Sequence, residues 1–431
     1  MRNPAEFELT EKVLINYGAE DEFGITLETI AEIAEDVEIV TIVDSEVQQK
    51  VVKSIYRNSN IDNFIFIISP SNSYWTRDYG PYFRFKQTKK SQYEIEVVDF
   101  NYDRPRPSDD EIPGIYANRE GLSMVSVPLE LSGGNYMTDG CGTAASTELI
   151  WSGSPGIDRV ETESLLSTYL GINSYHVIPD ALDLYIKHID CWAKFLSPDT
   201  VMVLKLPPVH DRYEELERAA QYFNNQISCY GTPYDVVRIY GGANAAPYTS
   251  SLILNDKILV PQTGGQWDNE ALNTYKRVMP GYEVIGFSAP SEHPWLSTDG
   301  LHCRVKGIPD DEMIYIEHTP LTDSLPAKNG FQVKARAISY GNAPFTNNTP
   351  VLYWKTGGKW KRLYMKEDKR HLFYADIPNQ PGGTVINYYI KAEDSNGKIR
   401  KHPYIGALDP HSFYVKKEIS LQIRKEGVVS G

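Results

Sequence analysis

Cysteine is scarce in this chain, whose 431 residues include only Cys141, Cys191, Cys229 and Cys303. Four cysteines are too few for a disulfide framework, and none belongs to a Cys-x-x-Cys pair. We therefore expect neither a structural zinc site nor any other metal centre. A free cysteine is ordinarily a small, buried and unreactive thiol, and we expect this of Cys141, Cys191 and Cys229.

Long apolar runs and an excess of basic charge are also missing. The longest apolar stretches, such as Phe64–Ile68, are far too short to span a bilayer. The chain does not open with a basic segment followed by an apolar one, so we expect no secretory signal within it. The net charge of −14 disfavours a nucleic-acid-binding surface. It is compatible with a cationic ligand but does not by itself indicate one.

The composition is that of a globular protein, and the length predicts two or three domains. From residue 1 to about 318, strand-like runs alternate with amphipathic helices, which is typical of α/β architecture. The predicted strands are Phe64–Ile68, Ile95–Phe100, Ser123–Val127, Val201–Leu206, Val236–Tyr240 and Ser251–Leu254. The predicted helices are Asp158–Leu170, which ends at Gly171, and Asp211–Ile227, with Asp211 as its N-cap.

Residues 319–416 have a different pattern, in which short strand-like alternations such as Phe331/Val333/Ala335 and Val385/Asn387/Tyr389 dominate. Turn residues such as Gly357-Gly358 and Asn396-Gly397 separate these alternations, and no helix of useful length is expected. This spacing predicts a small all-β sandwich of the immunoglobulin or fibronectin kind. Residues 417–431 are expected to form a polar tail.

Two polar segments follow predicted strands or turns in the first 318 residues. Trp75–Pro81 comes after the strand at 64–68, and strand ends in α/β sheets are where ligands bind, so Asp78 can face a pocket. The alternative is a closed turn in which Arg77 pairs with Asp78. Gly133-Gly134-Asn135 can let the backbone approach a ligand closely, although glycine-rich turns are common.

Two further segments carry side chains suited to catalysis. His188 and Asp190 would project to the same side of a strand, where a histidine beside a carboxylate suits a general acid/base. A structural histidine is the alternative. Cys303 follows a glycine-containing polar turn, with His302 adjacent. Combined with a distant histidine and aspartate, it would complete a nucleophile, base and orienting carboxylate.

Taken together, these segments resemble the bacterial peptidylarginine deiminase and agmatine deiminase family. The family motifs occur in order as Trp75–Pro81, Gly133–Asn135, His188–Asp190 and Gly300–Cys303. The resemblance implies a five-bladed α/β propeller of pseudo-fivefold ββαβ units with a central active site. It implies a catalytic domain at 1–318, followed by the β-sandwich at 319–416, and it implies no cofactor.

The resemblance also implies a role for each motif residue. Cys303 would be the nucleophile, His188 the acid/base, and Asp78 and Asp190 the carboxylates that hold a guanidinium. The chemistry is coherent because a guanidinium stays charged and its planar fork matches paired carboxylates. Its cationic carbon attracts a thiolate, which leads through a covalent thiouronium to citrulline and ammonia.

The substrate is indicated by the loop Asp103–Pro107, which contains Arg104 and Arg106. The loop resembles that of the Porphyromonas-type peptidylarginine branch, in which two arginines hold the α-carboxylate of a C-terminal arginine. A solvated loop is the alternative. The same branch implies peptide or protein substrates and a secreted or cell-surface location. Trp75 and Gly134 are weaker pocket candidates.

Ser250 is a departure from the family pattern. It occupies the place of a pocket asparagine in the segment Tyr248–Ile253, and serine reaches less far. Three alternatives remain open. The chain could deiminate free agmatine or arginine, it could be a transglutaminase or cysteine protease, or it could be an inactive deiminase-like binding module.

Overall fold

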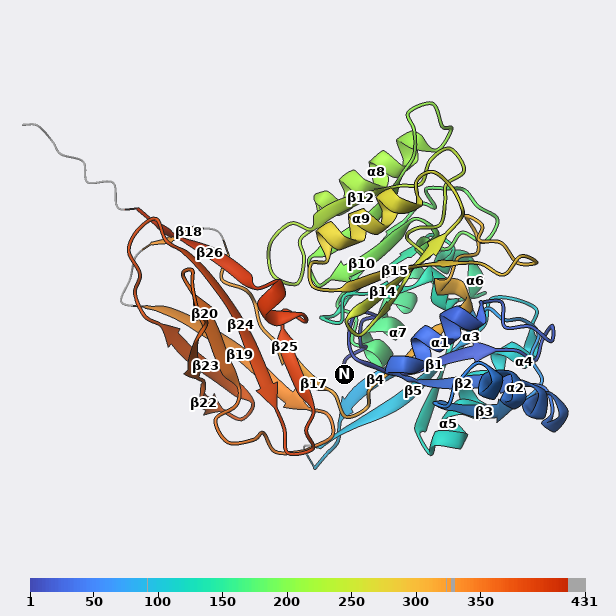
Figure 1. Cartoon of the computed structure of the whole chain (residues 1–431), viewed down its shortest axis with the longest axis horizontal. Helices are drawn as coiled ribbons and strands as arrows, with labels where there is room; N and C mark the ends of the chain where they lie inside the picture. Colours follow the sequence, from blue (N-terminus) through green and yellow to red (C-terminus); the bar gives the residue numbers. More distant parts are fainter. Residues whose placement is uncertain (91, 323, 327–329, 418–431) are drawn as a thin grey trace, which may run out of the picture. The chain divides into compact units, whose positions relative to one another are not determined.

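The computed structural model describes residues 1–90, 92–322, 324–326 and 330–417 (Figure 1). Residues 418–431 of the predicted polar tail lie outside the described residues. Tertiary contacts divide the chain into two compact units. The first unit comprises Met1–Met313 and Tyr340–Asn342, and the second comprises Ile314–Ser339 and the chain from Ala343 onward. The first unit is mixed α/β, as the alternating sequence pattern predicted.

The first unit contains five small sheets, in each of which an antiparallel pair of strands is extended by a parallel strand. The sheets are β16 (Lys306–Pro309), β1 (Thr10–Asn16), β2 (Glu38–Val43) and β3 (Phe64–Ile68); β4 (Tyr82–Gln87), β5 (Tyr93–Asn101) and β6 (Ser123–Glu130); β7 (Met137–Thr138), β8 (Thr143–Thr147) and β9 (Ser174–Ile178); β10 (Ala193–Ser197), β11 (Thr200–Lys205) and β12 (Asp235–Tyr240); and β13 (Leu252–Leu254), β14 (Lys257–Gln262) and β15 (Glu283–Ser288). Four of the six predicted strands fall within strands of these sheets, and the other two, Val201–Leu206 and Ser251–Leu254, extend one residue beyond β11 and β13.

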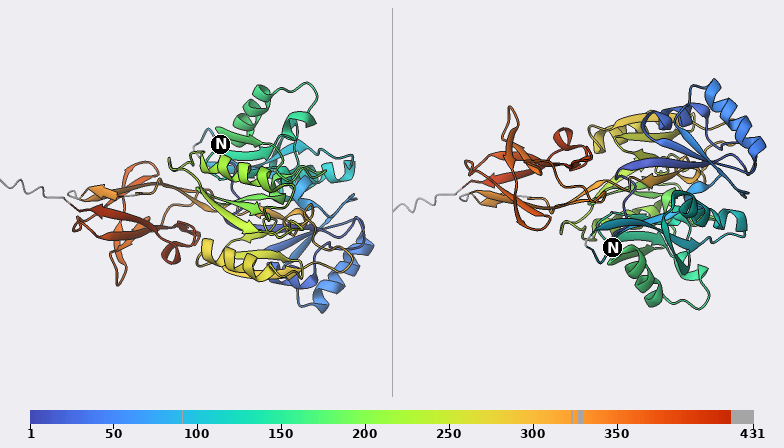
Figure 2. Two further views of the ribbon diagram at one scale, coloured as in Figure 1. Left: turned by 90° about the horizontal axis from the view of Figure 1, so that it is seen from above. Right: turned by 90° about the horizontal axis from the view of Figure 1, so that it is seen from below.

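Helices connect the parallel strands of every sheet, and Figure 2 shows them at the periphery of the first unit. They are α1 (Leu27–Asp36), α2 (Glu46–Asn58), α4 (Pro107–Asp110), α5 (Ile112–Glu120), α6 (Ile150–Gly153), α7 (Arg159–Leu170), α8 (Tyr213–Asn224) and α9 (Asp268–Val278). The order strand, strand, helix, strand therefore recurs five times, if the first sheet is taken to begin with β16, which comes from the end of the unit. None of the described helices is long and apolar enough to cross a membrane. The arrangement of the five sheets as propeller blades stays a prediction.

Local capping explains where α7 begins and ends. The side chain of Asp158 accepts a hydrogen bond from the Glu161 N–H, and Gly171 ends α7 with a φ of 74°, as predicted. The predicted helix 211–227 was too long at both ends. Arg212, not Asp211, precedes the first helical residue, and Ile227 instead forms an isolated bridge with Pro233.

The strand β3 is less buried than its apolar sequence indicated, because it lies at the edge of its sheet. Ile68 is 47% exposed. The main core near this sheet contains Ile30 and Ile33 of α1 together with Leu301 and Val305. Complete burial of a large aliphatic side chain contributes about 1.5–3 kcal/mol. Leu301 and Val305 therefore anchor the turn that carries Cys303.

The second unit consists of two sheets whose inward side chains form one core. One sheet contains β17 (Ile314–Glu317), β19 (Phe331–Ser339), β23 (Leu372–Ile377) and β22 (Lys366–Lys369); the other contains β18 (Ser324–Pro326), β26 (His411–Lys416), β24 (Val385–Glu393), β20 (Val351–Lys355), β21 (Lys361–Tyr364) and β25 (Ile399–His402). In β24 the buried side is Ile386, Tyr388 and Ile390, which alternates with the residues noted in the sequence. The described residues of this unit contain no helix longer than one 3-10 turn. The immunoglobulin-like topology stays a prediction.

Candidate active site

The predicted site segments occupy equivalent positions in the five strand–strand–helix–strand repeats, directly before the first strand of each sheet. They are α3 (Thr76–Tyr79) before β4, η1 (Gly133–Asn135) before β7, η2 (Ile189–Cys191) before β10, Ser250 before β13, and η3 (His302–Arg304) before β16. The short helix α3 contacts both η1 and η3, and η1 contacts η2. The fold thus brings the motifs of separate sheets to one point.

Gly134 lies at the centre of this cluster. Its backbone N–H donates to Asp78 Oδ1 over 3.1 Å. A Cβ atom at this position would lie 2.5 Å from His188 Nδ1, 2.7 Å from Asp78 Oδ1 and 3.2 Å from Asp190 Oδ2. Three of the predicted catalytic side chains therefore surround a backbone position that only glycine can occupy without displacing them.

Cys303 completes the cluster from η3. Its sulfur lies 3.8 Å from Asp190 Oδ2 and 3.7 Å from Ser250 Oγ, and the residue is 3% exposed. Burial raises the pKa of the Cys303 thiol well above its usual value, and the charges of Asp190 and Asp78 raise it further. The thiol is therefore neutral until a positive charge reaches it.

Asp78 and His188 face each other across the same space. His188 Nδ1 lies 3.5 Å from Asp78 Oδ1, and neither ring nitrogen of His188 has a hydrogen-bond partner among the described residues. His188 is 1% exposed, so its ring is fixed by burial while its nitrogens can still form hydrogen bonds with a ligand. Burial raises the pKa of Asp78 to about 6, although the His188 charge opposes this. A ligand that donates hydrogen bonds could therefore bind to both Asp78 and His188.

Asp190 belongs to a hydrogen-bonded chain that extends away from the thiol. Its Oδ2 pairs with His302 Nδ1 over 2.8 Å, and His302 Nε2 contacts a carboxylate oxygen of Glu6. Burial would raise the pKa of Asp190, but the hydrogen bond from His302 and the His302 and His188 charges lower it below its usual value. Asp190 is therefore ionised beside the neutral thiol of Cys303.

Glu6 is held by two buried cations as well as by His302. Its carboxylate lies 2.8 Å from Lys194 Nζ and 3.4 Å from Arg77 Nη2. Burial opposes ionisation, but the charges of His302, Lys194 and Arg77 lower the pKa of Glu6 well below its usual value. The sequence analysis missed Glu6, because a lone glutamate near the chain start carries no local signal.

The conformation around His188 and Asp190 corrects the predicted strand. Residues 189–191 form a 3-10 turn, and Lys187 before it has a φ of 52°, so this segment is not extended. Asn135, the last residue of the predicted glycine-rich segment, accepts hydrogen bonds from the N–H groups of Thr147 and Ile189. It therefore fixes the turn that carries the two catalytic candidates.

Two buried arginines also hold the site segments. Arg77 does not pair with Asp78, as the closed-turn alternative supposed, but donates to the His302 carbonyl over 3.3 Å and pairs with Glu6. Arg304, which is 1% exposed, binds both carboxylate oxygens of Asp299 at 2.9 and 2.7 Å. Such bidentate pairing fixes geometry, here that of the turn on which Cys303 lies.

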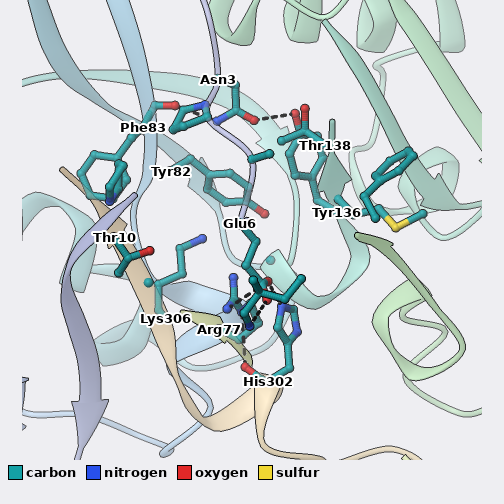
Figure 3. Close-up of a pocket in the computed structure, with 18 of the residues that line it drawn as sticks. Asn3, Glu6, Thr10, Arg77, Tyr82, Phe83, Tyr136, Thr138, His302 and Lys306 are labelled. Atoms are coloured by element: carbon teal, nitrogen blue, oxygen red, sulfur yellow. Dashed lines mark hydrogen bonds and ion pairs between the residues drawn. The ribbon is translucent and has the colours of Figure 1, made fainter. Parts of the chain in front are cut away.

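A cavity of about 110 Å³ lies on the other side of Asp190 and His302, both of which line it. Figure 3 shows Glu6, Arg77 and His302 clustered at one end of it and Lys306 extending into it. Cys303, His188 and Asp78 are not among the described residues that line this cavity. It is therefore distinct from the space in front of the thiol.

The predicted carboxylate-binding loop lies against two site segments. The Arg106 guanidinium carbon lies 4.5 Å from the centroid of the half-buried Trp75 ring, three residues before Asp78. Arg104 donates to the carbonyl of Ile186, two residues before His188, over 3.4 Å. Both arginines are partly exposed, so their guanidinium groups remain accessible.

Solved structures share the fold of the first unit. The agmatine deiminase of Enterococcus faecalis matches with a TM-score of 0.61 at 21% identity, over 72% of this chain and 95% of that chain. A deiminase from Porphyromonas gingivalis matches with a TM-score of 0.61 at 19% identity, over 72% and 98% of the two chains. These likenesses show that the first unit has the fold of these deiminases.

Sequence comparison gives the family. The model of the Porphyromonas-type peptidyl-arginine deiminase family matches residues 2–309, and the chain belongs to this family of hydrolytic guanidine-modifying deiminases. A Vibrio parahaemolyticus protein named agmatine deiminase is 26% identical over 278 residues, which are 56% of this chain and 76% of that protein. A similarly named Shewanella frigidimarina protein is 24% identical over 280 residues, or 56% and 74%.

Proposed function

We propose that the first unit hydrolyses the guanidinium of an arginine side chain to citrulline and ammonia, with Cys303 as nucleophile. The observation that carries this proposal is the set of two carboxylates, one imidazole and one thiol around Gly134. A guanidinium brings a permanent positive charge to this buried acidic space. Its pairing with Asp78 and Asp190 offsets the cost of their burial.

The steps follow from the charges of these groups. The bound cation lowers the pKa of the Cys303 thiol, the thiol proton passes to His188, and the resulting thiolate attacks the guanidinium carbon. The tetrahedral adduct expels ammonia, to which His188 supplies the proton, and a thiouronium remains on the sulfur. His188 then takes a proton from water, which attacks the same carbon. The carbon–sulfur bond breaks, and the ureido product and the thiol are released.

We further propose that the substrate is a peptide or protein with a C-terminal arginine. Two guanidinium groups near the site suit a carboxylate, which each can bind through paired hydrogen bonds. Arg106 over Trp75 and Arg104 beside Ile186 supply these groups in this chain. A substrate arginine at the chain end carries such a carboxylate next to its side chain.

Agmatine is the second candidate substrate, because relatives in sequence are named agmatine deiminase. Agmatine has a guanidinium but no carboxylate, so it would leave Arg104 and Arg106 without a substrate carboxylate to bind. It would use the same four groups for the chemical steps. The two candidates differ only in what the loop at residues 103–107 contributes.

The test measures citrulline or carbamoyl product together with ammonia. Peptides ending in arginine, peptides with internal arginine, free arginine and agmatine are compared, with Cys303→Ala as control. We expect turnover that is fastest for the C-terminal arginine peptides and absent in Cys303→Ala. Equal or faster turnover of agmatine would reject the peptide proposal, and no product from any substrate would favour a binding module.

The positions of the site segments also support a finer proposal about the fold. Segments from the same point of five repeats meet in one cluster. We propose that the five sheets surround this point as the blades of a propeller.

A further inference from the structure

A second group of reactive side chains lies outside the candidate active site. Asp139 and Cys141 belong to the hairpin turn between β7 and β8, and Cys229 belongs to the loop between α8 and β12. One carboxylate oxygen and the two sulfurs all lie within 4.8 Å of one another. Two neighbouring sheets therefore contribute ligand atoms to one spot.

The carboxylate of Asp139 is held in place through one of its two oxygens, and the other oxygen has no hydrogen bond from a described residue. Its Oδ1 accepts hydrogen bonds from the backbone N–H groups of Cys141 at 2.7 Å and Thr143 at 2.9 Å. The residue is 0% exposed, and its Oδ2 accepts no hydrogen bond from any described residue. A buried carboxylate oxygen without a donor is costly, so this oxygen calls for a positive partner.

A second buried polar atom without a hydrogen-bond partner among the described residues lies in the loop that contains Cys229. The hydroxyl of Tyr234, in the same loop as Cys229, is buried and has no partner among the described residues. The Cys229 sulfur lies 3.9 Å from the Pro198 carbonyl and is half-buried, whereas Cys141 is exposed. A ligand can therefore enter from the Cys141 side and reach the buried oxygen of Asp139.

We propose that Asp139, Cys141 and Cys229 bind a zinc-class divalent cation, with water as the fourth ligand. Thiolate sulfur and carboxylate oxygen are ordinary zinc ligands, and two sulfurs bound at about 2.3 Å to a tetrahedral ion lie about 3.8 Å apart. That spacing fits within the observed 4.8 Å limit, so only small side-chain rotations are needed. Binding releases the two thiol protons as the metal–sulfur bonds form.

A disulfide is the competing outcome for two neighbouring thiols. It would join Cys141 to Cys229 but leave the buried Asp139 Oδ2 without a partner. A divalent cation satisfies that oxygen and neutralises most of the charge of the three ligands. The metal would tie the β7–β8 turn to the loop before β12, which makes it a structural link separate from the proposed reaction.

The test titrates the reduced, chelator-treated full chain with Co²⁺ and then with Zn²⁺. We expect a thiolate-to-cobalt charge-transfer absorption with one ion per chain, its displacement by Zn²⁺, and a rise in Tm with Zn²⁺. Cys229→Ser should weaken binding by at least about 100-fold, because loss of an outer-shell partner alone costs 10–100-fold. Cys303→Ser serves as the matched control and should keep both signals, since its thiol lies elsewhere.

Three results would overturn the assignment. They are no cobalt–thiolate absorption in the unaltered chain, an absorption that persists in Cys229→Ser, and a Cys141–Cys229 disulfide in protein isolated without reductant that binds no cobalt once reduced. Asp139→Asn keeps the size of the side chain and removes its charge. With unchanged circular dichroism it should bind Co²⁺ more weakly, whereas unaltered affinity would reject its place in the site.

Discussion

At the scale of single residues, the site depends on one position that has no side chain. Gly134 allows Asp78, His188 and Asp190 to converge because nothing projects from its backbone into the space between them. Catalysis that depends on positioned groups is sensitive to displacements of about 1 Å. The absence of a Cβ atom is therefore as important here as the presence of the acid/base.

Gly134→Ala is expected to lower kcat/KM by about 100-fold or more, because its Cβ would lie 2.5 Å from His188 Nδ1 and force it to move. The overall fold should persist, since this glycine has no left-handed backbone conformation. Steady-state kinetics and Tm are the measurements. Gly114→Ala is the matched control, because its added Cβ would meet only Met124 atoms at 3.8 Å. Full activity in Gly134→Ala would contradict the inferred geometry.

Glu6 acts on the reaction only through other residues. Each ring nitrogen of His302 faces a carboxylate oxygen, of Glu6 on one side and Asp190 on the other. Burial and the Arg77 and Lys194 charges lower the pKa of His302, although Glu6 and Asp190 oppose this. A neutral ring donates to only one of the two carboxylates, so the charge of Glu6 influences how Asp190 is held. Glu6 is thus a positioning residue.

Glu6→Gln is expected to lower kcat by about 10-fold or more while KM changes little, and to shift the acidic limb of the kcat/KM–pH profile. The pH profile is the decisive measurement, since loss of folded protein alone would lower the apparent kcat at constant KM but would not shift the profile. Glu8→Gln is the matched control, because Glu8 is also a buried N-terminal carboxylate but pairs with Arg2. An unchanged profile in Glu6→Gln would remove Glu6 from the relay.

At the scale of elements, short turns rather than strands carry the chemistry. The catalytic candidates lie in α3, η2 and η3 or at their edges, and each turn is fixed by buried partners such as Asn135, Arg77 and Arg304. The loop at residues 103–107 differs, because its arginines are partly exposed and contact Trp75, Tyr102, Asp103 and the Ile186 carbonyl. This element is suited to substrate selection.

Removal of the loop arginines should affect only substrates that carry a carboxylate. Arg104→Ala with Arg106→Ala is expected to raise KM for a C-terminal arginine peptide by about 10- to 100-fold, since charged hydrogen bonds contribute about 1.5–3 kcal/mol. The KM for agmatine should stay unchanged. Arg119→Ala, a partly exposed arginine of α5, is the control. An equal rise for both substrates would show that the loop acts on the site as a whole.

At the scale of the whole molecule, the second unit has a pH sensitivity of its own. His318, His402 and His411 pack together, with ring centroids 5.0 to 5.5 Å apart. Burial lowers the pKa of His318 to about 4, and burial with the neighbouring histidines lowers those of His402 and His411 well below the usual value. These rings are neutral in the folded unit.

Because the unfolded chain binds protons at these histidines near pH 6.5, their contribution to stability is complete above that pH and is lost as the pH falls toward 4. For His318 alone this amounts to about 3 kcal/mol. Hydrogen exchange of β24 peptides, corrected for intrinsic rates, should show lower opening free energies at pH 5 than at pH 7.5. His318→Gln should flatten this dependence strongly, and His371→Gln, in the turn after β22, should flatten it less, because burial also lowers the pKa of His371 but that residue is only partly buried. Equal protection at both pH values would refute the expectation.

Much of the fold was predictable from local patterns. Apolar runs indicated the strands, and Gly171 indicated the end of α7, because both signals depend on neighbours within a few residues. The excess length predicted for α8 and the strand predicted for His188–Asp190 were wrong. After α8 a local contact, the Ile227–Pro233 bridge, takes the place of further helix. At Ile189 a tertiary contact, the hydrogen bond to Asn135, holds the turn.

The sequence by itself determined which residues to consider at the site, because the four motifs appear in order with their side chains intact. Only the tertiary structure decided that His302 and Glu6 form a hydrogen-bonded chain with Asp190. It also decided that Cys229 lies beside Cys141 and Asp139. The physical reason is the same in each case. These contacts join turns from different sheets, and sequence periodicity reports the burial of a residue within its own element but not which distant turn packs against it.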